Sequence, residues 1–365
     1  MGAELQKTSL HQLHLASGAR MGAFAGWDMP LSYAGTLAEH RAVRAHAGAF
    51  DVSHMGQIEI RGWDAAEFLQ RMLTNDIARI VPGEGQYTLM LNTTGGVIDD
   101  LIAYDRGDDY LLVVNASNTG ACLDWLTRHG PDGLAITDRS METAMIALQG
   151  VDWKRLLSGV GASDRTLGLG YFHFAQDGLA GTSAMVARTG YTGEPGVELL
   201  VPWDEGPALW SALMALDDPP EPAGLVARDT LRLEMGYPLH GNDIGPDRTP
   251  LEAGLGWACD MDTEFTAVDV LRARREEGLA ERLCAFVLTE RGIPRRGQDV
   301  LVDGEVCGAV TSGSLSPTLD VGIGLAYVRT EVAEPGTEIA IDVRGSVKGA
   351  EIRHLPLVDT SPKKG

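Results

Sequence analysis

Short, strand-like runs of apolar and polar residues fill the first third of the chain, and glycine or polar turn residues separate them. Residues 57–61 alternate between apolar and polar side chains, which is typical of a strand with one buried face. Residues 86–91 and 110–115 are richer in apolar side chains, and we interpret them as further strands. The pair Gly95-Gly96 predicts a tight turn into a return strand that carries Asp100.

Two segments of this region show helical spacing instead. Residues 63–73 contain Asp64 and Glu67, three residues apart as in a capping box, followed by apolar residues on one face. Residues 121–129 repeat the helical pattern. The order of strand, helix, strand, turn, two strands and helix predicts an α+β unit with a mainly antiparallel sheet.

A second unit of mixed structure follows. Its predicted strands are residues 145–148, 184–187 and 197–201, and its predicted helices are residues 207–216 and 227–235. Residues 217–222 are rich in acids and proline, so we expect a surface loop there.

The composition of the chain changes after residue 270. Residues 272–281 form a charged run that favours a helix. Beyond it, short apolar runs between glycine-containing turns predict a small β-barrel or sandwich, which we assign to a separate domain over residues 282–359. The predicted strands are residues 284–288, 299–302, 306–311, 321–328 and 338–343.

The most informative chemical feature is a pair of acids, Asp99 and Asp100, that follows the glycine turn inside an apolar run. Ionised carboxylates are costly to place among apolar residues unless they are paired, hydrogen-bonded or in use. One interpretation is a hairpin whose acids point into water. The other is that Asp100 faces a ligand, while Asp99, on the opposite face of the strand, is structural.

Two further segments carry candidate chemistry. Residues 189–198 contain three glycines and place Glu198 among apolar neighbours, where a carboxylate could accept two N–H groups of a ligand. An exposed acid in a hairpin is the alternative. Arg228 and Arg232 lie four residues apart on one face of a predicted helix. They could bind a carboxylate or pair with acidic neighbours on the same helix.

Charge and cysteine usage narrow the functional classes. A net charge of −21 argues against a general nucleic-acid or anionic-membrane surface. The four cysteines lack the spacing of a zinc site or redox motif, and residues 1–20 do not resemble a signal peptide, so we expect a cytoplasmic protein with reduced thiols. A phosphate-binding P-loop, a zinc-protease motif and a serine nucleophile elbow are all missing from the sequence.

Taken together, these segments resemble the glycine cleavage system T-protein (aminomethyltransferase) family. The matching stretches occur in the family's order and extend over the whole chain. They are residues 26–31, 50–55, 95–100, 114–115, 189–194, 227–234, 311–313 and 316–319. Val226 and His240 differ from the residues usual in the family, and we expect both to lie away from the bound pterin.

The resemblance implies an α+β fold arranged as a three-part cloverleaf around a central hole. Residues 1–278 would form a folate-binding region of two α/β sandwich-like subdomains, with one inserted at roughly residues 52–137, and residues 282–359 would form the C-terminal β-barrel. The implied reaction transfers a methylene group from an aminomethyl-lipoyl carrier, the H-protein, to tetrahydrofolate. The products would be 5,10-methylenetetrahydrofolate, ammonia and the dihydrolipoyl carrier.

The resemblance also implies the residues of the site. Asp100 would lie beside the folate nitrogens as the catalytic acid, where a fixed anion stabilises positive charge that develops in the transition state. Glu198 would hold the N–H edge of the pterin ring. The other folate-binding residues would be Met55, Tyr87, Tyr104, Asn115, Tyr171, Tyr191 and Arg228.

Tetrahydrofolate would be a co-substrate, and neither a metal nor a flavin would be required. The expected partners are the lipoylated H-protein and small-molecule folate, without nucleic acid or membrane, and we expect a monomer. Two alternatives on the same fold are a tetrahydrofolate-dependent demethylase of a small methyl donor and a non-catalytic folate-binding accessory protein. Residues 189–194 and the Asp99-Asp100 pair favour the aminomethyltransferase.

Overall fold

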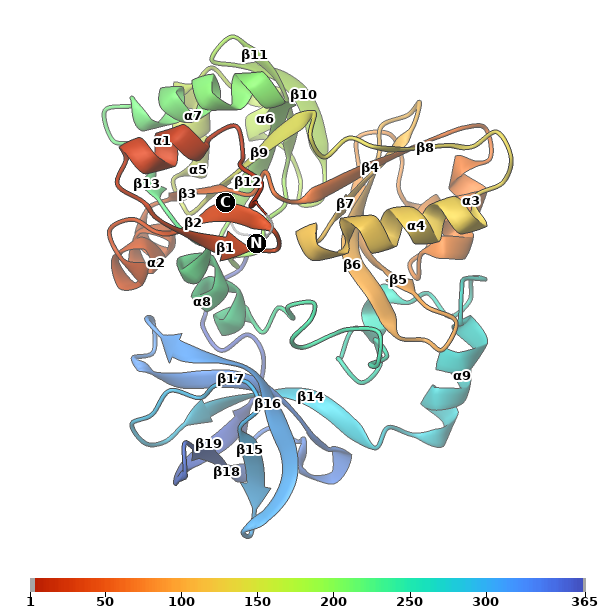
Figure 1. Ribbon diagram of the computed structural model, residues 1–365, viewed down its shortest axis with the longest axis vertical. Helices are drawn as coiled ribbons and strands as arrows, with labels where there is room; N and C mark the ends of the chain where they lie inside the picture. Colours follow the sequence, from red (N-terminus) through yellow and green to blue (C-terminus); the bar gives the residue numbers. More distant parts are fainter. Residues whose placement is uncertain (1–3, 364–365) are drawn as a thin grey trace.

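The protein folds into three lobes, two of mixed α/β structure and one built mainly of strands (Figure 1). The structure is a computed structural model, and it describes residues 4–363. Residues 1–3, which belong to the N-terminal segment considered above, lie outside this range. The α+β fold with a C-terminal barrel that the sequence predicts is confirmed.

The first lobe is built on a six-stranded sheet with the order β10-β11-β12-β9-β3-β13. Its strands are β3 (Gly48–Asp51), β9 (Thr143–Gln149), β10 (Phe174–Leu179), β11 (Thr182–Ala187), β12 (Gly196–Pro202) and β13 (Glu221–Pro222). Its helices are α1 (His11–Ala16), α2 (Thr36–Ala45), α5 (Trp153–Gly159), α6 (Asp164–Leu167), η3 (Trp203–Glu205), α7 (Gly206–Met214) and α8 (Leu225–Met235). A hairpin packs beside α8, and its strands are β1 (Arg20–Phe24) and β2 (Trp27–Ser32).

The second lobe is inserted into the first lobe between β3 and β9, on a five-stranded sheet with the order β5-β6-β7-β4-β8. Its strands are β4 (Gly56–Arg61), β5 (Gly85–Leu91), β6 (Val97–Asp105), β7 (Tyr110–Val114) and β8 (Ala135–Asp138). Its helices are α3 (Ala65–Met72), η1 (Ile77–Arg79), η2 (Ala116–Asn118) and α4 (Thr119–His129). The chain leaves and re-enters the first lobe at one place, because the N–H of Val52 donates to the carbonyl of Met145 at 2.9 Å.

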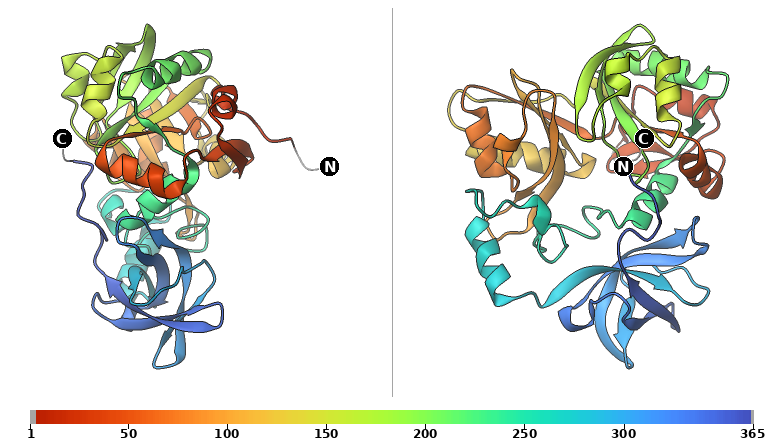
Figure 2. Two further views of the ribbon diagram at one scale, coloured as in Figure 1. Left: turned by 90° about the vertical axis from the view of Figure 1, so that its left-hand side faces the viewer. Right: turned by 180° about the vertical axis from the view of Figure 1, so that it is seen from behind.

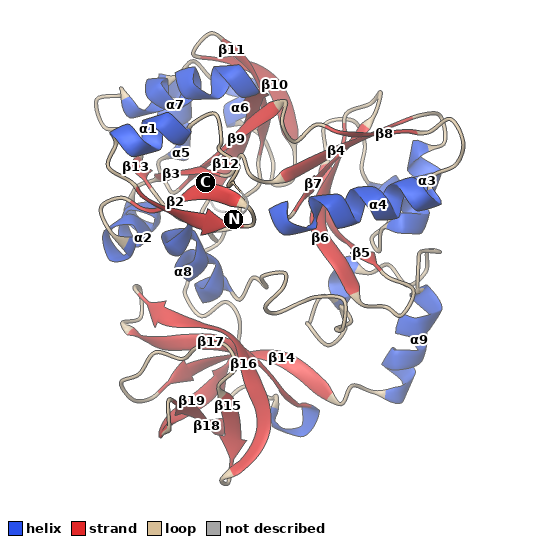
Figure 3. Cartoon of the chain, in the orientation of Figure 1, coloured by secondary structure: helices blue, strands red, loops and turns tan. Residues whose placement is uncertain are grey.

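The two α/β lobes pack with their sheets toward each other. Tyr104 and Leu111 of the second lobe share one apolar core with Phe50, Met145 and Met185 of the first lobe. Helices α5 and α7 cover the outer face of the first sheet, and α3 and α4 cover that of the second (Figure 3). This layering brings β6 and β7 of one lobe beside β12 of the other.

The third lobe is a closed barrel with the strand order β14-β17-β16-β15-β18-β19. Helix α9 runs along the outer side of the molecule between the second lobe and this barrel (Figure 2). The elements of this part are η4 (Gly256–Ala258), α9 (Val268–Glu277), β14 (Glu281–Leu288), β15 (Asp299–Val302), β16 (Glu305–Ser316), β17 (Val321–Arg329), η5 (Thr330–Val332), β18 (Glu338–Val343) and β19 (Ser346–Arg353).

Two local predictions were wrong in detail. Asp64 stands at the N-cap of α3 but makes no capping hydrogen bond with its side chain, because its φ of −103° and ψ of 8° differ from the extended backbone typical of a capping residue. The charged helix expected over residues 272–281 begins earlier and ends at Glu277. Gly278, with a φ of 82°, ends it, since this backbone conformation favours glycine.

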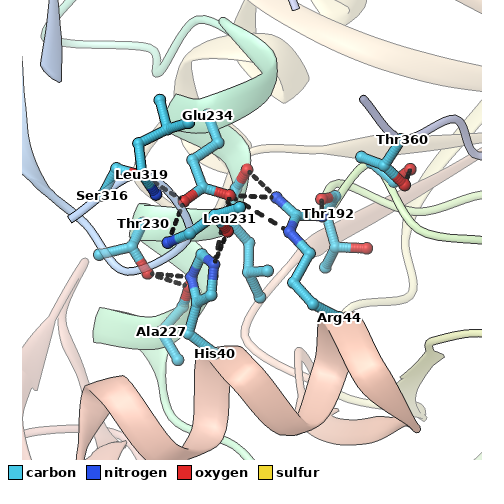
Figure 4. Close-up of polar contacts among 12 residues, drawn as sticks. His40, Arg44, Thr192, Ala227, Thr230, Leu231, Glu234, Ser316, Leu319 and Thr360 are labelled. Atoms are coloured by element: carbon cyan, nitrogen blue, oxygen red, sulfur yellow. Dashed lines mark hydrogen bonds and ion pairs between the residues drawn. The ribbon is translucent and has the colours of Figure 1, made fainter. Parts of the chain in front are cut away.

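A polar junction around the buried carboxylate of Glu234 ties α8 to α2 and to the barrel. We define it by His40, Arg44, Glu234 and Ser316 (Figure 4), together with the exposed Thr318, whose hydroxyl donates to Glu234 at 2.9 Å. Glu234 accepts hydrogen bonds from Arg44 at 2.8 Å and Ser316 at 2.5 Å. His40 lies 3.2 Å from the same carboxylate. Burial alone would raise the pKa of Glu234, but the hydrogen bonds and charges of these partners lower the pKa to about 2.

Candidate functional site

The turn between β5 and β6 fixes the position of the acid pair. Asn92 Oδ1 accepts hydrogen bonds from the N–H groups of Thr94 at 2.9 Å and Gly96 at 3.0 Å. Gly95 has a φ of 85°, a conformation that favours glycine. Gly96 has no room for a side chain, because a Cβ atom would lie 1.8 Å from the carbonyl oxygen of Pro246. The two glycines therefore allow the loop around Pro246 to pack against the start of β6.

Asp100 is held by two side chains that the sequence places in the same site. Tyr87 is its diagonal neighbour, because the strand register pairs Tyr87 with Ile102. The Tyr87 hydroxyl donates to Asp100 Oδ2 at 3.0 Å. Asn115, directly after β7, donates from Nδ2 to Asp100 Oδ1 at 2.9 Å. The structure thus brings together three of the predicted site residues.

Asp99 is fully buried and shares a hydrogen-bond donor with Asp100. Its Oδ1 accepts from Asn115 Nδ2 at 2.8 Å and from Asn118 Nδ2 at 2.6 Å. Its Oδ2 accepts from the backbone N–H of Asn115 at 2.9 Å. Strand alternation alone predicts that the two acids are separated, but the side-chain amide of Asn115 joins them.

Burial raises the pKa of both carboxyls. For Asp99, burial and the charge of Asp100 raise the pKa to about 7, although hydrogen bonds from Asn118 and Asn115 oppose the change. For Asp100, burial raises the pKa, while the hydrogen bond from Tyr87 opposes it. A carboxyl that titrates closer to neutral pH is suited to accept and release protons during a reaction.

A second group of site residues lies on β12 and the loop before it. Glu198 is 7% exposed, and its Oε2 accepts a hydrogen bond from Thr189 Oγ1 at 2.6 Å. The Thr189 hydroxyl also lies 3.0 Å from the hydroxyl of Tyr104. Tyr104 is fully buried in the core between the two sheets, so in the structure it supports Thr189 and, through it, Glu198. That Tyr104 also lines a pterin slot stays a prediction.

Arg228 of α8 lies opposite Glu198, with 4.0 Å between its Nη2 and Glu198 Oε1. Its guanidinium is 5.2 Å from the ring centroid of Tyr191, a cation–π distance. Among the described residues, its buried Nη1 has no hydrogen-bond partner. Burial lowers the pKa of Arg228, although the charges of Glu198 and Tyr191 act in the opposite direction and raise it. Because an unpaired buried donor is costly, an acceptor from a ligand fits this position.

The two arginines of α8 have different surroundings. Arg232 donates to Asp229 at 2.8 Å, to Asp243 at 2.9 Å and to Ser312 of the barrel at 2.9 Å. Arg232 therefore pairs with acids and links α8 to the barrel. Of the two sequence-based interpretations, acid pairing holds for Arg232, whereas Arg228 faces the site.

Tyr191 connects the Asp100 group of residues with the Glu198 group. Its hydroxyl donates to the carbonyl of Pro238, and its ring stacks on Tyr237 with 5.7 Å between centroids. Burial raises the pKa of Tyr191, and the charge of Asp100 contributes to the increase. The two groups of residues therefore border one another.

Tyr171 and Met55 are half-buried at the edge of the same region. Burial raises the pKa of Tyr171, and the charge of Glu198 contributes, so Tyr171 lies near that carboxylate. Met55 packs against the core between the two sheets. Their contact with a ligand stays a prediction.

Sequence reasoning missed three residues beside the site. His54 is 5% exposed, its Nδ1 has no partner among the described residues, and burial lowers its pKa to about 4. Trp257 is 67% exposed and stacks on Tyr87 with 5.3 Å between centroids. His240 lies near enough to Asp100 for its charge to lower the pKa of Asp100, so its expected distance from the site was wrong. His54 lies in the matching stretch of residues 50–55, whereas His240, in the loop after α8, and Trp257, in η4, lie in none of the matching stretches.

Two surface hollows lie near these residues but do not include Asp100. One, of about 430 Å³, is lined by Arg44, Glu194 and Thr360 among others, and the second, of about 420 Å³, is lined by Trp257 and Leu251 among others. Within residues 4–363, His, Cys, Asp and Glu form no group of three or more that is placed to hold a metal ion. Over the same residues, every helix is too short or too polar to cross a bilayer.

Comparison with known proteins gives matches over almost the whole chain. Residues 10–263 match the GCVT N-terminal domain, and residues 281–359 match the glycine cleavage T-protein C-terminal barrel domain. An aminomethyltransferase of Rubrobacter xylanophilus is 47% identical, covering 93% of this chain and 91% of the relative. An aminomethyltransferase of Geobacillus kaustophilus is 45% identical, covering 96% of this chain and 98% of the relative.

A solved structure agrees with these matches. The glycine cleavage system aminomethyltransferase T of Bartonella henselae has a TM-score of 0.92 and 34% identity, covering 99% of this chain and all of that chain. By fold and by its full-length relatives, the chain is an aminomethyltransferase. It belongs to the glycine cleavage T-protein family, as its sequence motifs predict.

Proposed function

We propose that this aminomethyltransferase takes the methylene group from the aminomethyl-lipoyl arm of an H-protein and transfers it to tetrahydrofolate. The products are 5,10-methylenetetrahydrofolate, ammonia and the dihydrolipoyl carrier. The observation that carries the proposal is the pairing of Glu198 with Arg228, whose buried Nη1 has no hydrogen-bond partner within residues 4–363, in a region that borders Asp100.

The edge of a pterin ring matches this pair of side chains. It presents an amino group and a ring N–H side by side, followed by a carbonyl oxygen. A carboxylate such as that of Glu198 accepts two neighbouring N–H groups. The guanidinium of Arg228, 4.0 Å from that carboxylate, offers a donor for the carbonyl. Thr189 holds Glu198 in place from its other side at 2.6 Å.

Apolar and aromatic side chains suit the flat part of the same ligand. The ring of Tyr191 lies 5.2 Å from the guanidinium of Arg228, and Tyr171 lies near Glu198. With Met55 these side chains would form a lining of the kind that is common in ligand sites for flat molecules. Asn115 and Tyr87 hold Asp100 toward the end of the ligand where the chemistry takes place.

In the proposed reaction, folate N5 attacks the methylene carbon and the amine leaves as ammonia. N10 then bonds to the same carbon as the carbon–sulfur bond breaks. The folate nitrogens lose two protons in total, and these end on ammonia and on the lipoyl sulfur. Asp100 relays protons between these groups and stabilises the positive charge that develops on the folate nitrogens.

The methylene carbon keeps its oxidation level in this sequence of steps, so the proposed chemistry calls for neither a flavin nor a metal. The binding partners in the proposal are the lipoylated H-protein and folate. We further propose that the chain acts as a monomer in the cytoplasm.

The test is an assay of the full-length protein with aminomethyl-lipoyl H-protein and tetrahydrofolate, in which methylenetetrahydrofolate and ammonia are followed together. We expect equal amounts of both products. A parallel assay replaces the carrier with dimethylsulfoniopropionate as a small methyl donor. Turnover of that donor alone, or folate binding with turnover of neither donor, would overturn the proposal.

A further inference from the structure

The side-chain amide of Asn115 contacts two neighbouring carboxylates at once. Its Nδ2 lies 2.8 Å from Asp99 Oδ1 and 2.9 Å from Asp100 Oδ1. Because both contacts end on one nitrogen, the two carboxylates are close neighbours. Asp99 is fully buried, and it lies one residue away from the acid to which the proposed function assigns the chemistry.

In the part of the chain that the structure describes, the groups that hydrogen-bond to this pair are neutral. Asp99 accepts from the Asn118 amide at 2.6 Å and from the Cys122 thiol at 3.7 Å. Asp100 accepts from the Tyr87 hydroxyl at 3.0 Å. The charged or titratable groups that act on the pair from the surrounding elements are Tyr87 of β5, Cys122 of α4, Tyr191 of the first lobe and His240 of the loop after α8.

We propose that Asp99 is a positioning residue for Asp100, and that the two carboxyl groups, joined by Asn115, hold a single proton between them. The proposal rests on the proposed function, since it gives Asp100 its part in proton transfer. It concerns what Asp99 does to Asp100 before any substrate binds.

The physical reason is the cost of two like charges side by side, one on the fully buried Asp99 and one on the half-buried Asp100. The first carboxyl to ionise has hydrogen-bond donors on its oxygens and is stabilised by them. The second ionisation then places a negative charge beside the first, with little water to screen it. Burial and the charge of Asp100 accordingly raise the pKa of Asp99 to about 7. The protons of such a pair leave in two steps that belong to both groups.

The shared proton has a use in the reaction. Near pH 7, where the pair titrates between no proton and one, the fully ionised pair takes one proton from a folate nitrogen and shares it, and the pair returns to the fully ionised state when Asp100 passes the proton to the leaving amine or thiolate. Each transfer moves one proton, so the charge of the carboxyl pair changes by one and returns to its starting value at the end of the cycle. Asp99 thus keeps Asp100 able to accept and release protons near neutral pH.

The experiment is a pH titration of the full-length protein labelled with ¹³C at the aspartate carboxyl carbons, followed by NMR without folate or carrier. Signals of the pair are assigned by their loss in Asp99→Asn and Asp100→Asn. In the wild type we expect both signals to move in the same two steps, with the second step near pH 7. In Asp99→Asn we expect the midpoint of Asp100 to fall by about one pH unit or more.

A second variant keeps the test sharp, because Asp99→Asn exchanges an acceptor oxygen for a donor in a fully satisfied site and can lower stability. Coupling between two titrating groups is reciprocal. Asp100→Asn must therefore lower the midpoint of Asp99 by the same amount. Asp105→Asn is the matched control, since Asp105 lies on the same strand and, among the hydrogen bonds described, its carboxylate accepts only from the Gly107 backbone N–H at 2.8 Å.

A merely structural role for Asp99 would lower thermal stability and leave the midpoint of Asp100 where it is. Independent titration of the two acids, or an unchanged midpoint in both variants, would overturn the inference. Because the titration uses neither folate nor carrier, its failure is distinguishable from failure of the turnover assay. In the enzyme assay, Asp99→Asn should also move the pH profile of kcat toward lower pH.

Discussion

Ser316 of the barrel donates a hydrogen bond of 2.5 Å to Glu234 of α8. This contact joins residues that are far apart in the chain, and Arg44 of α2 binds the same carboxylate at 2.8 Å. One buried acid therefore holds the barrel, α8 and α2 together. The contribution of this polar junction to the free energy of unfolding can be measured separately from enzyme activity.

Replacing this acid should destabilise the protein in a pH-dependent way. The pKa of Glu234 is lowered from 4.5 to about 2, so its ionised form stabilises the fold above pH 4.5 and this stability is lost as the pH falls toward 2. The shift corresponds to about 3 kcal/mol. Urea unfolding of Glu234→Gln should show a free energy of unfolding that is much lower than that of the wild type at pH 7. The difference between variant and wild type should be much smaller at pH 3.

The control for this measurement is Glu67→Gln. Glu67 pairs with Arg71 on an exposed helix surface, where an ion pair contributes about 1 kcal/mol or less. If the two variants lost equal free energy of unfolding at pH 7, the polar junction would not have the stabilising role assigned to it.

Asp100→Asn should separate binding from catalysis. The variant keeps the shape of the side chain, so we expect the affinity for tetrahydrofolate to stay within about tenfold. Turnover should fall by about two to three powers of ten, because the charge matters most as bonds change. Isothermal titration with tetrahydrofolate and the coupled product assay measure the two quantities. Asp108→Asn, at an exposed position in the turn between β6 and β7, should behave as the wild type, and full activity of Asp100→Asn would refute the role of this acid.

Glu198→Gln should weaken folate binding, because an amide can accept only one of the two N–H groups of the pterin edge. We expect a loss in affinity of about ten- to a hundredfold, as is usual when a hydrogen bond to a charged group is broken. Arg228→Met, which removes the unpaired donor, should weaken binding as well. Arg232→Met is an informative comparison. Its partners are Asp243 and Ser312, so it should lower stability rather than specifically affect the pterin.

Tyr87→Phe should move the pH dependence of the reaction upward. Burial raises the pKa of Asp100, and the hydrogen bond from Tyr87 opposes this increase. Without the hydroxyl, the pKa of Asp100 rises further, and the limb of kcat that requires ionised Asp100 moves to higher pH. A kcat profile measured in matched buffers tests this, with Tyr110→Phe on β7 as the control. If the pH profile of kcat did not shift, or shifted to lower pH, the hydrogen bond from Tyr87 would not be holding down the pKa of Asp100.

Local motifs indicated the two acids of the candidate site, because both acids sit next to turns with strong sequence signals. Asp100 follows Gly95-Gly96, and Glu198 follows a glycine-rich loop, so each could be named from its own segment. The hydrogen bond between Tyr87 and Asp100 also follows from the hairpin register once the turn is known. Strand positions were predicted well for the same reason.

Features that depend on long-range packing could not be read in this way. The relay from Tyr104 through Thr189 to Glu198 joins the sheets of two lobes, and its register is fixed by the apolar core between them. The stacking of Trp257 on Tyr87 depends on how the segment that carries η4 folds back over β5. The capping residue Asp64 has the right identity, but its backbone angles are set by the chain around it.

The single crossing point between the two α/β lobes, marked by the hydrogen bond between Val52 and Met145, has a consequence for protein engineering. The inserted lobe enters and leaves through neighbouring strands, so it is a module that recombination can exchange as one piece. Such an exchange would carry Asp100 and Asn115 into a new host and leave Glu198 and Arg228 behind. The two groups of residues are thus carried by separate segments. An exchange would have to match the facing sheets and also the surface of β5 and β6 that packs against residues 244–271.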